Sequence, residues 1–157
     1  MRRDYFTLDV SGLDWVEHGG EPTKPTVIID FEGPASLLQE RITGFSAELL
    51  EDSEIDVSFR FMTEADDPDA KGVVSITDRI TGDYVLELNA PAEKVFSFIK
   101  AARAFGDHES DDTDRYRIEI RIDADPVVAY DKRTFLVYDK DGNLLRNDSL
   151  IPSGVEL

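Results

Sequence analysis

Alternation of hydrophobic and polar residues predicts two strands that each have one buried and one solvated face. Residues 55–62 (IDVSFRFM) place every second side chain, from Ile55 to Phe61, on the same face of a sheet. Residues 115–123 (RYRIEIRID) repeat this period of two, with Tyr116 and three isoleucines on the apolar face. Shorter runs predict strands at 5–10 and 26–31, and the β-branched, apolar composition of 26–31 favours a central position.

Two pairs of segments predict β-hairpins. Residues 73–81 and 83–89 meet at Thr81-Gly82-Asp83, and residues 133–139 and 143–150 flank Asp141-Gly142. Glycine beside aspartate is typical of the tight turns that join antiparallel strands. The remaining stretches, 11–25, 63–72 and 107–114, are rich in Gly and Pro or in acidic residues, so we expect loops there.

The clearest helix prediction covers residues 91–105, where apolar side chains recur at helical spacing. Pro91 suits a first helical position and Gly106 a C-terminal stop. Residues 35–50 also show helical spacing, but Gly44 interrupts it, so this stretch is either a short helix or a pair of short strands. The pattern as a whole predicts an α+β fold, a mostly antiparallel sheet with one or two helices packed on one face.

The length of 157 residues predicts one domain covering 1–157, and a 41% hydrophobic content is enough for a core. There is no cysteine, which excludes disulfides, thiolate metal sites and cysteine nucleophiles. No apolar run has the length of a signal peptide or a transmembrane helix, so we expect a cytoplasmic protein.

The charge is strongly acidic, with 34 acidic residues against 17 basic ones and a formal net charge of −17. Nucleic acids and anionic membranes require a basic surface, so neither is an expected partner. An acidic surface repels itself in dilute salt and is relieved by screening in concentrated salt. The composition resembles that of small, acidic, uncharacterised proteins of halophilic archaea, which implies an adaptation to salt. An ordinary acidic protein with a charged partner is the alternative.

Arginines on the strand at 115–123 form a local exception to the acidic surface. Arg115, Arg117 and Arg121 lie on its predicted polar face, and Arg60 could join them from a neighbouring strand. The guanidinium group suits carboxylate or phosphate, so these four residues are candidates for binding an anion or an acidic partner. Cross-strand pairing with acidic neighbours is the structural alternative. Trp15, the only tryptophan, is a further candidate for recognition, or else a residue that covers one end of the core.

Catalytic and metal-binding signals are weak. The two histidines, His18 and His108, both fall in predicted loops, and no nucleophile motif accompanies them. Asp67, Asp69 and Asp78 match positions one, three and twelve of a calcium-binding loop, but Lys71 occupies position five, where a ligand is required. We therefore expect no catalytic residue, no metal and no cofactor.

The sequence thus favours a non-enzymatic binding or interaction module, whose partner is an unidentified protein or a small anion, and which could form a homodimer. The alternative is a small, hydrolase-like enzyme that uses His18 or His108 with nearby carboxylates.

Overall fold

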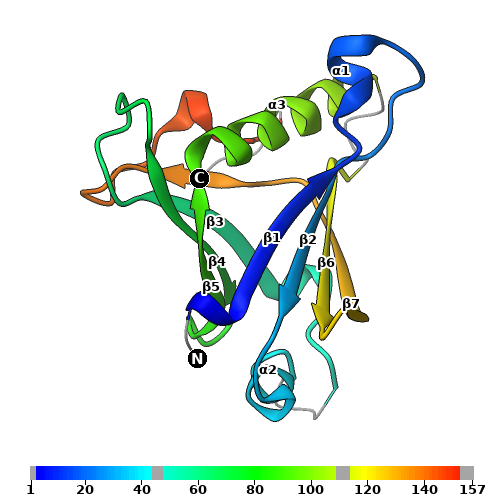
Figure 1. Ribbon diagram of the computed structural model, residues 1–157, viewed down its shortest axis with the longest axis vertical. Helices are drawn as coiled ribbons and strands as arrows, with labels where there is room; N and C mark the ends of the chain where they lie inside the picture. Colours follow the sequence, from blue (N-terminus) through cyan, green and yellow to red (C-terminus); the bar gives the residue numbers. More distant parts are fainter. Residues whose placement is uncertain (1–2, 44–47, 109–113, 153–157) are drawn as a thin grey trace.

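The computed structural model describes residues 3–43, 48–108 and 114–152 (Figure 1). Within these ranges, eight strands form two four-stranded sheets, and helices lie at both ends of the pair of sheets. The predicted α+β class is confirmed. None of the helices in this part of the chain is long and apolar enough to cross a membrane.

The first sheet has the order β1-β2-β6-β7. Its strands are β1 (Phe6–Ser11), β2 (Thr26–Phe31), β6 (Tyr116–Ile122) and β7 (Asp125–Lys132). The β1–β2 and β6–β7 pairs are antiparallel, whereas the central β2–β6 pair is parallel. The three strands predicted in this sheet are confirmed, and β2 is central as expected.

The sequence pattern missed β7. It follows β6 through a two-residue turn in which Asp123 and Ala124 both have positive φ, of 48° and 70°. Hairpin turns of this kind usually have Gly at the second position, and the alanine there removed the turn signal that an Asp-Gly pair would have given.

The second sheet has the order β5-β4-β3-β8. Its strands are β3 (Ile55–Phe61), β4 (Lys71–Asp78), β5 (Tyr84–Pro91) and β8 (Leu136–Tyr138). The predicted β4–β5 hairpin is confirmed. The second predicted hairpin is much shorter than expected. Its first strand, β8, has only three residues and pairs with β3. The segment predicted as its second strand, 143–150, makes isolated bridges and a 3-10 turn, η3 (Arg146–Asp148).

The long helix α3 (Ala92–His108) confirms the main helix prediction with shifted ends. Pro91 is the last residue of β5 rather than the first of the helix. The helix also continues through Gly106 instead of stopping there. The glycine serves packing rather than termination, because the buried guanidinium of Arg115 occupies the space that a side chain at 106 would need.

Three shorter elements complete this part of the chain. The predicted loop at 11–25 contains a one-turn helix, α1 (Asp14–His18). The ambiguous stretch at 35–50 begins with helix α2 (Ala35–Arg41), as the short-helix alternative predicted. Residues 44–47 of that stretch, and 109–113 of the predicted acidic loop, lie outside the described residues. A 3-10 turn, η2 (Asp52–Glu54), leads into β3.

The core lies between the two sheets, and α3 crosses one end of them (Figure 1). Ile29 of the first sheet, Phe59 of the second and Phe98 of α3 are almost completely buried in it. The ring of Phe98 packs edge-on against Tyr116 of β6, at 5.2 Å between centroids, and contacts Phe135 before β8. These contacts attach α3 to both sheets.

Two lysines join elements at the sheet edges. Lys94 of α3 donates to the carbonyl oxygen of Leu8 on β1 over 3.0 Å. Lys132, at the end of β7, donates from Nζ to the carbonyl oxygens of Asp52 (2.7 Å) and Ile55 (2.8 Å), which lie where the second sheet begins. Charge-assisted hydrogen bonds of this kind are stronger than neutral ones, so they help to fix the position of one sheet against the other.

Candidate protein-interaction site

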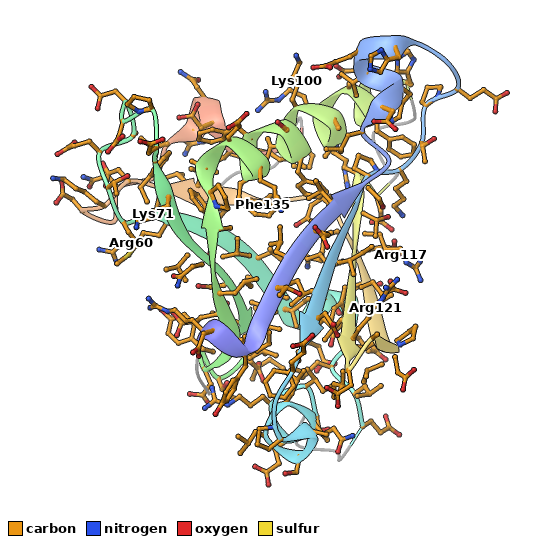
Figure 2. All side chains as sticks on the ribbon, in the orientation of Figure 1. Arg60, Lys71, Lys100, Arg117, Arg121 and Phe135 are labelled. Atoms are coloured by element: carbon orange, nitrogen blue, oxygen red, sulfur yellow. The ribbon has the colours of Figure 1, made fainter. Side chains whose placement is uncertain are left out.

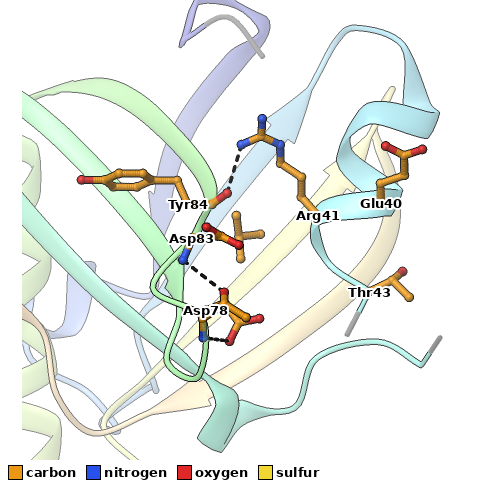
Figure 3. A pocket seen from close by; sticks show the side chains of 8 residues that line it. Glu40, Arg41, Thr43, Asp78, Asp83 and Tyr84 are labelled. Carbon is orange, nitrogen blue, oxygen red and sulfur yellow. Dashed lines mark hydrogen bonds between the residues drawn. The ribbon is translucent and has the colours of Figure 1, made fainter. Parts of the chain in front are cut away.

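A cavity of about 500 Å³ lies between α2 and the β4–β5 hairpin (Figure 3). The α2 side contributes Glu40, Arg41 and Thr43, and the hairpin contributes Asp78, Thr81, Asp83, Tyr84 and Val85. This volume is within the range of about 300–1,000 Å³ that is usual for binding pockets.

Asp78 fixes the hairpin side of this cavity. Its Oδ1 accepts hydrogen bonds from the backbone N–H groups of Ile80 (2.9 Å) and Thr81 (3.3 Å), and its own N–H donates to the carbonyl of Asp83. Gly82 adopts a positive φ of 77°, a conformation that favours glycine. The turn is therefore set by an aspartate and a glycine, both visible in the sequence.

Arg41 fixes the other side. It lies in the last turn of α2, and its Nη1 donates to the carbonyl oxygen of Tyr84 on β5 over 3.0 Å (Figure 3). Beyond α2, the hydroxyl of Thr43 donates to the carbonyl of Gln39 over 2.6 Å. The helix is thus tied to the strand that forms the opposite wall.

The lining is acidic, because three carboxylates, Glu40, Asp78 and Asp83, face one cation, Arg41. Among the described residues, Arg41 makes its recorded polar contact with a carbonyl rather than with any of these carboxylates. With three carboxylates against one guanidinium, the lining keeps an excess of negative charge, and the cavity favours a cationic group.

Both elements that line this cavity carry exposed apolar side chains. Five large hydrophobic residues are exposed in the part of the chain that the structure describes: Leu37 (41%), Leu49 (46%), Met62 (56%), Ile80 (71%) and Tyr84 (51%). Leu37 is on α2, and Ile80 and Tyr84 are on the β4–β5 hairpin, so three of the five belong to the two elements that line the cavity. Tyr84 is itself in the lining, and Ile80 is in the turn at the tip of the hairpin. Leu37 lies on the same face of α2 as Glu40 and Arg41, because it precedes them by three and four residues. Leu49 pairs with Thr43 in an isolated bridge. Clustered exposed apolar residues of this kind mark interaction surfaces.

The arginines proposed from the sequence do not form one surface. Arg60 is on β3 of the second sheet, whereas Arg117 and Arg121 are on β6 of the first, on the opposite side of the molecule (Figure 2). Arg117 approaches the carboxylate of Asp131 at 3.7 Å, and Arg121 donates twice to Glu119, at 2.9 and 2.5 Å. Cross-strand pairing, the alternative interpretation, therefore describes Arg117, whereas Arg121 pairs with an acidic residue of its own strand. A role for both in anion binding stays a prediction.

Arg115 is buried instead of lying beside Arg117, with only 7% of its surface exposed. It precedes β6, so the alternation of the strand does not govern its direction, and its guanidinium packs against Gly106 of α3. Its Nε is buried with no hydrogen-bond partner in the described residues. Trp15 is half-buried on α1, where its indole N–H donates to the carbonyl of Gly12 (2.6 Å) and its ring meets that of His108 edge-on at 6.0 Å.

The remaining chemical candidates are not brought together. Neither His18 nor His108 shares a recorded hydrogen bond with a carboxylate in the described residues, and neither lines the cavity at α2. Asp78 is at the far end of β4 from the turn that contains Asp67 and Asp69. Their separation follows from the strand, because residues 71–78 are extended rather than coiled around an ion. In the ranges that the structure describes, no group of three or more His, Asp or Glu residues could hold a metal.

A second cleft, between the edges of the two sheets, contains Lys132 together with Asp56, Arg79 and Asp114. Burial lowers the pKa of Lys132, and the nearby charge of Arg79 lowers it further, while Asp56, Asp52 and Asp114 act in the opposite direction. Because Nζ already donates to two carbonyls, we assign Lys132 to holding the sheets together.

Comparison with known proteins adds a family to this geometry. The family of unknown function DUF5793 matches residues 1–157. The chain belongs to that family. No curated protein and no solved structure matches the chain.

The cavity at α2 is therefore a feature of this DUF5793 member that sequence reasoning missed. One signal could have found it: Ile80 is an apolar residue in a hairpin turn, where polar residues are expected. The other three exposed residues give no such signal, because leucines in a helical pattern and tyrosines in strands are more often part of the core.

Proposed function

We propose that this protein is a non-enzymatic interaction module, and that the cavity between α2 and the β4–β5 hairpin docks a segment of another protein. The segment inserts a lysine or arginine side chain toward Glu40, Asp78 and Asp83. Its flanking apolar residues pack on Ile80, Tyr84 and Leu37.

One observation carries this proposal: an acidic cavity lies between two elements that each carry exposed apolar side chains, Leu37 on α2 and Ile80 and Tyr84 on the hairpin. Burying apolar area contributes about 25 cal/mol per Å² and is the main favourable term in protein association. The carboxylates then select a basic partner, since charge complementarity supplies specificity more than affinity. An exposed isoleucine at the tip of a turn fits the role of an anchor residue.

The net charge of −17 favours a different protein as the occupant over a second copy of the chain. Two copies repel each other electrostatically, and a basic segment is attracted. The acidic surface and its resemblance to proteins of halophiles are consistent with docking in concentrated salt, because screening weakens the charge term but leaves the apolar contact in place.

Selection from a library of random 12-residue peptides, followed by measurement of Kd by fluorescence anisotropy, tests the proposal. The selected peptides are expected to combine a basic residue with apolar neighbours. Substituting Ile80→Ser or Asp83→Lys should weaken their binding at least tenfold.

Two matched controls separate this site from general effects. Met62→Ser removes an exposed apolar residue elsewhere, and Asp66→Lys makes the same charge change in the loop at the opposite end of β4. Neither should change Kd more than about twofold. The proposal is contradicted if the selected peptides are acidic or share no common residues. It is also contradicted if the control variants weaken binding as much as Ile80→Ser and Asp83→Lys do, or if the chain binds only itself.

A further inference from the structure

A separate depression, distinct from the cleft that contains Lys132, lies on the outer face of the β5-β4-β3-β8 sheet, away from the core. Its volume is about 600 Å³. Strand register places Glu87, Ser75, Ser58 and Leu136 in one row across the four strands. Val73, Arg60 and Tyr138 form part of the neighbouring row on the same face.

The floor of this groove is formed by small polar side chains. Ser58, Ser75 and Thr77 lie at its centre, and Tyr84 and Tyr138 stand at its two sides. All three floor residues are partly buried, and none of their hydroxyls makes a recorded hydrogen bond in the described residues. Each hydroxyl can both donate and accept, so the floor offers unused hydrogen-bonding capacity to a ligand.

The groove is basic although the protein is acidic. Arg3, Arg60 and Lys140 line it, against the single carboxylate of Glu87. Arg3 pairs with the half-buried carboxylate of Glu87 at 3.5 Å, and Lys140 pairs with the exposed carboxylate of Glu64. Surface pairs of this kind contribute little to stability, so either cation can exchange its carboxylate for the anion of a ligand.

Arg60 is held in place without a carboxylate. Its Nη2 donates to the carbonyl oxygen of Lys140 over 2.8 Å, which fixes the guanidinium over the turn that contains Gly142. No ion pair is recorded for it among the described residues. Its remaining N–H groups are available to an oxyanion, and the planar fork of arginine matches phosphate and carboxylate.

We propose that this groove binds a small organic molecule that carries a phosphate or carboxylate group. Arg60 takes the oxyanion, and the hydroxyls of Ser58 and Ser75 hydrogen-bond the polar remainder of the molecule. Its arginine and hydroxyl groups are separate from the residues of the docking cavity at α2, and Tyr84 lines both sites. It favours a small molecule because the depression is bounded on two sides, by the segment with Arg3 and by the turn near Gly142.

Isothermal titration at constant ionic strength, with ribose 5-phosphate, citrate and inorganic phosphate as the three probes, tests this assignment. We expect at least one organic probe to bind more tightly than inorganic phosphate, and Arg60→Gln to weaken that binding at least tenfold. Ser58→Ala with Ser75→Ala should weaken the organic probe while leaving inorganic phosphate within twofold.

Arg103→Gln is the matched control, because Arg103 of α3 is also an exposed arginine whose guanidinium donates to a backbone carbonyl oxygen, that of Ser149. It should leave all three affinities unchanged. Preference for ribose 5-phosphate or for citrate then distinguishes a phosphate from a carboxylate ligand. Failure of all three probes to bind, or binding that survives Arg60→Gln, overturns the assignment.

Discussion

Removing one hydroxyl from the core should stabilise this protein. Tyr130 of β7 is 1% exposed, and its hydroxyl is buried with no hydrogen-bond partner in the described residues. Tyr116 provides a matched control on the neighbouring strand. It is equally buried, but its hydroxyl donates to the carbonyl oxygen of Thr134 over 2.6 Å.

The magnitude follows from this difference between the two tyrosines. A buried polar group without a partner costs about 1–3 kcal/mol, whereas a satisfied hydrogen bond contributes about 0.5–1.5 kcal/mol. Tyr130→Phe should therefore raise the free energy of unfolding by about 1 kcal/mol, after the small void left by the oxygen is counted. Tyr116→Phe should lower it by about the same amount and leave the Thr134 carbonyl without its donor.

The alkaline pH dependence gives a second, independent signature. Burial, with smaller contributions from the charges of Asp52 and Glu54, raises the pKa of Tyr130 to about 12 from its ordinary value of 10.0. Above pH 10 the unfolded chain releases this proton while the folded chain retains it, so stability falls as the pH rises from 10 toward 12. Two pKa units correspond to a loss of up to about 3 kcal/mol.

Urea unfolding followed by circular dichroism, at pH 8 and at steps from pH 9 to 12, measures both effects. Tyr130→Phe should be more stable than the natural sequence at pH 8 and should lose less stability above pH 10. The reasoning is refuted if Tyr130→Phe and Tyr116→Phe are destabilised equally at pH 8, or if their alkaline losses match that of the natural sequence.

Three further predictions concern packing and charge. Gly106→Ala should destabilise the protein, because the new Cβ would overlap the guanidinium of Arg115. Helix propensity alone would make the same substitution stabilising by about 1 kcal/mol. In an Arg115→Ala background, chemical denaturation should therefore show that Gly106→Ala increases the free energy of unfolding. Lys132→Met should cost about 2–4 kcal/mol, because it leaves two carbonyl oxygens without their donor, and an unchanged urea midpoint would contradict this. The thermal unfolding midpoint should rise between millimolar and molar KCl, and a midpoint independent of salt would rule out the salt-adapted interpretation of the acidic surface.

Local patterns predicted the elements of this fold well, and long-range relations poorly. The alternation in 55–62 and 115–123 defined β3 and β6 because a half-buried strand repeats with period two. The pattern could not show that these strands belong to different sheets, since both have the same alternation. This is why Arg60 was grouped with Arg117 and Arg121, which lie on the other sheet.

Residues at the ends of elements account for the other differences. Arg115 precedes β6 and turns toward α3. Gly106 lies inside α3, and its lack of a side chain leaves room for the guanidinium of Arg115. The packing of each residue depends on the other, so neither conformation can be predicted from the residues next to it in the sequence. The docking cavity likewise depends on α2 and the β4–β5 hairpin meeting in space, across about forty residues of sequence.

The most direct test of the proposed docking site is a titration of ¹⁵N-labelled protein with one selected basic, apolar peptide, followed by amide chemical shifts. The largest changes should be confined to α2 and residues 78–85, and they should disappear in Ile80→Ser but persist in Met62→Ser. The account is contradicted if the largest chemical-shift changes are centred on α3 or on the outer face of either sheet. It is also contradicted if the shifts change with protein concentration alone.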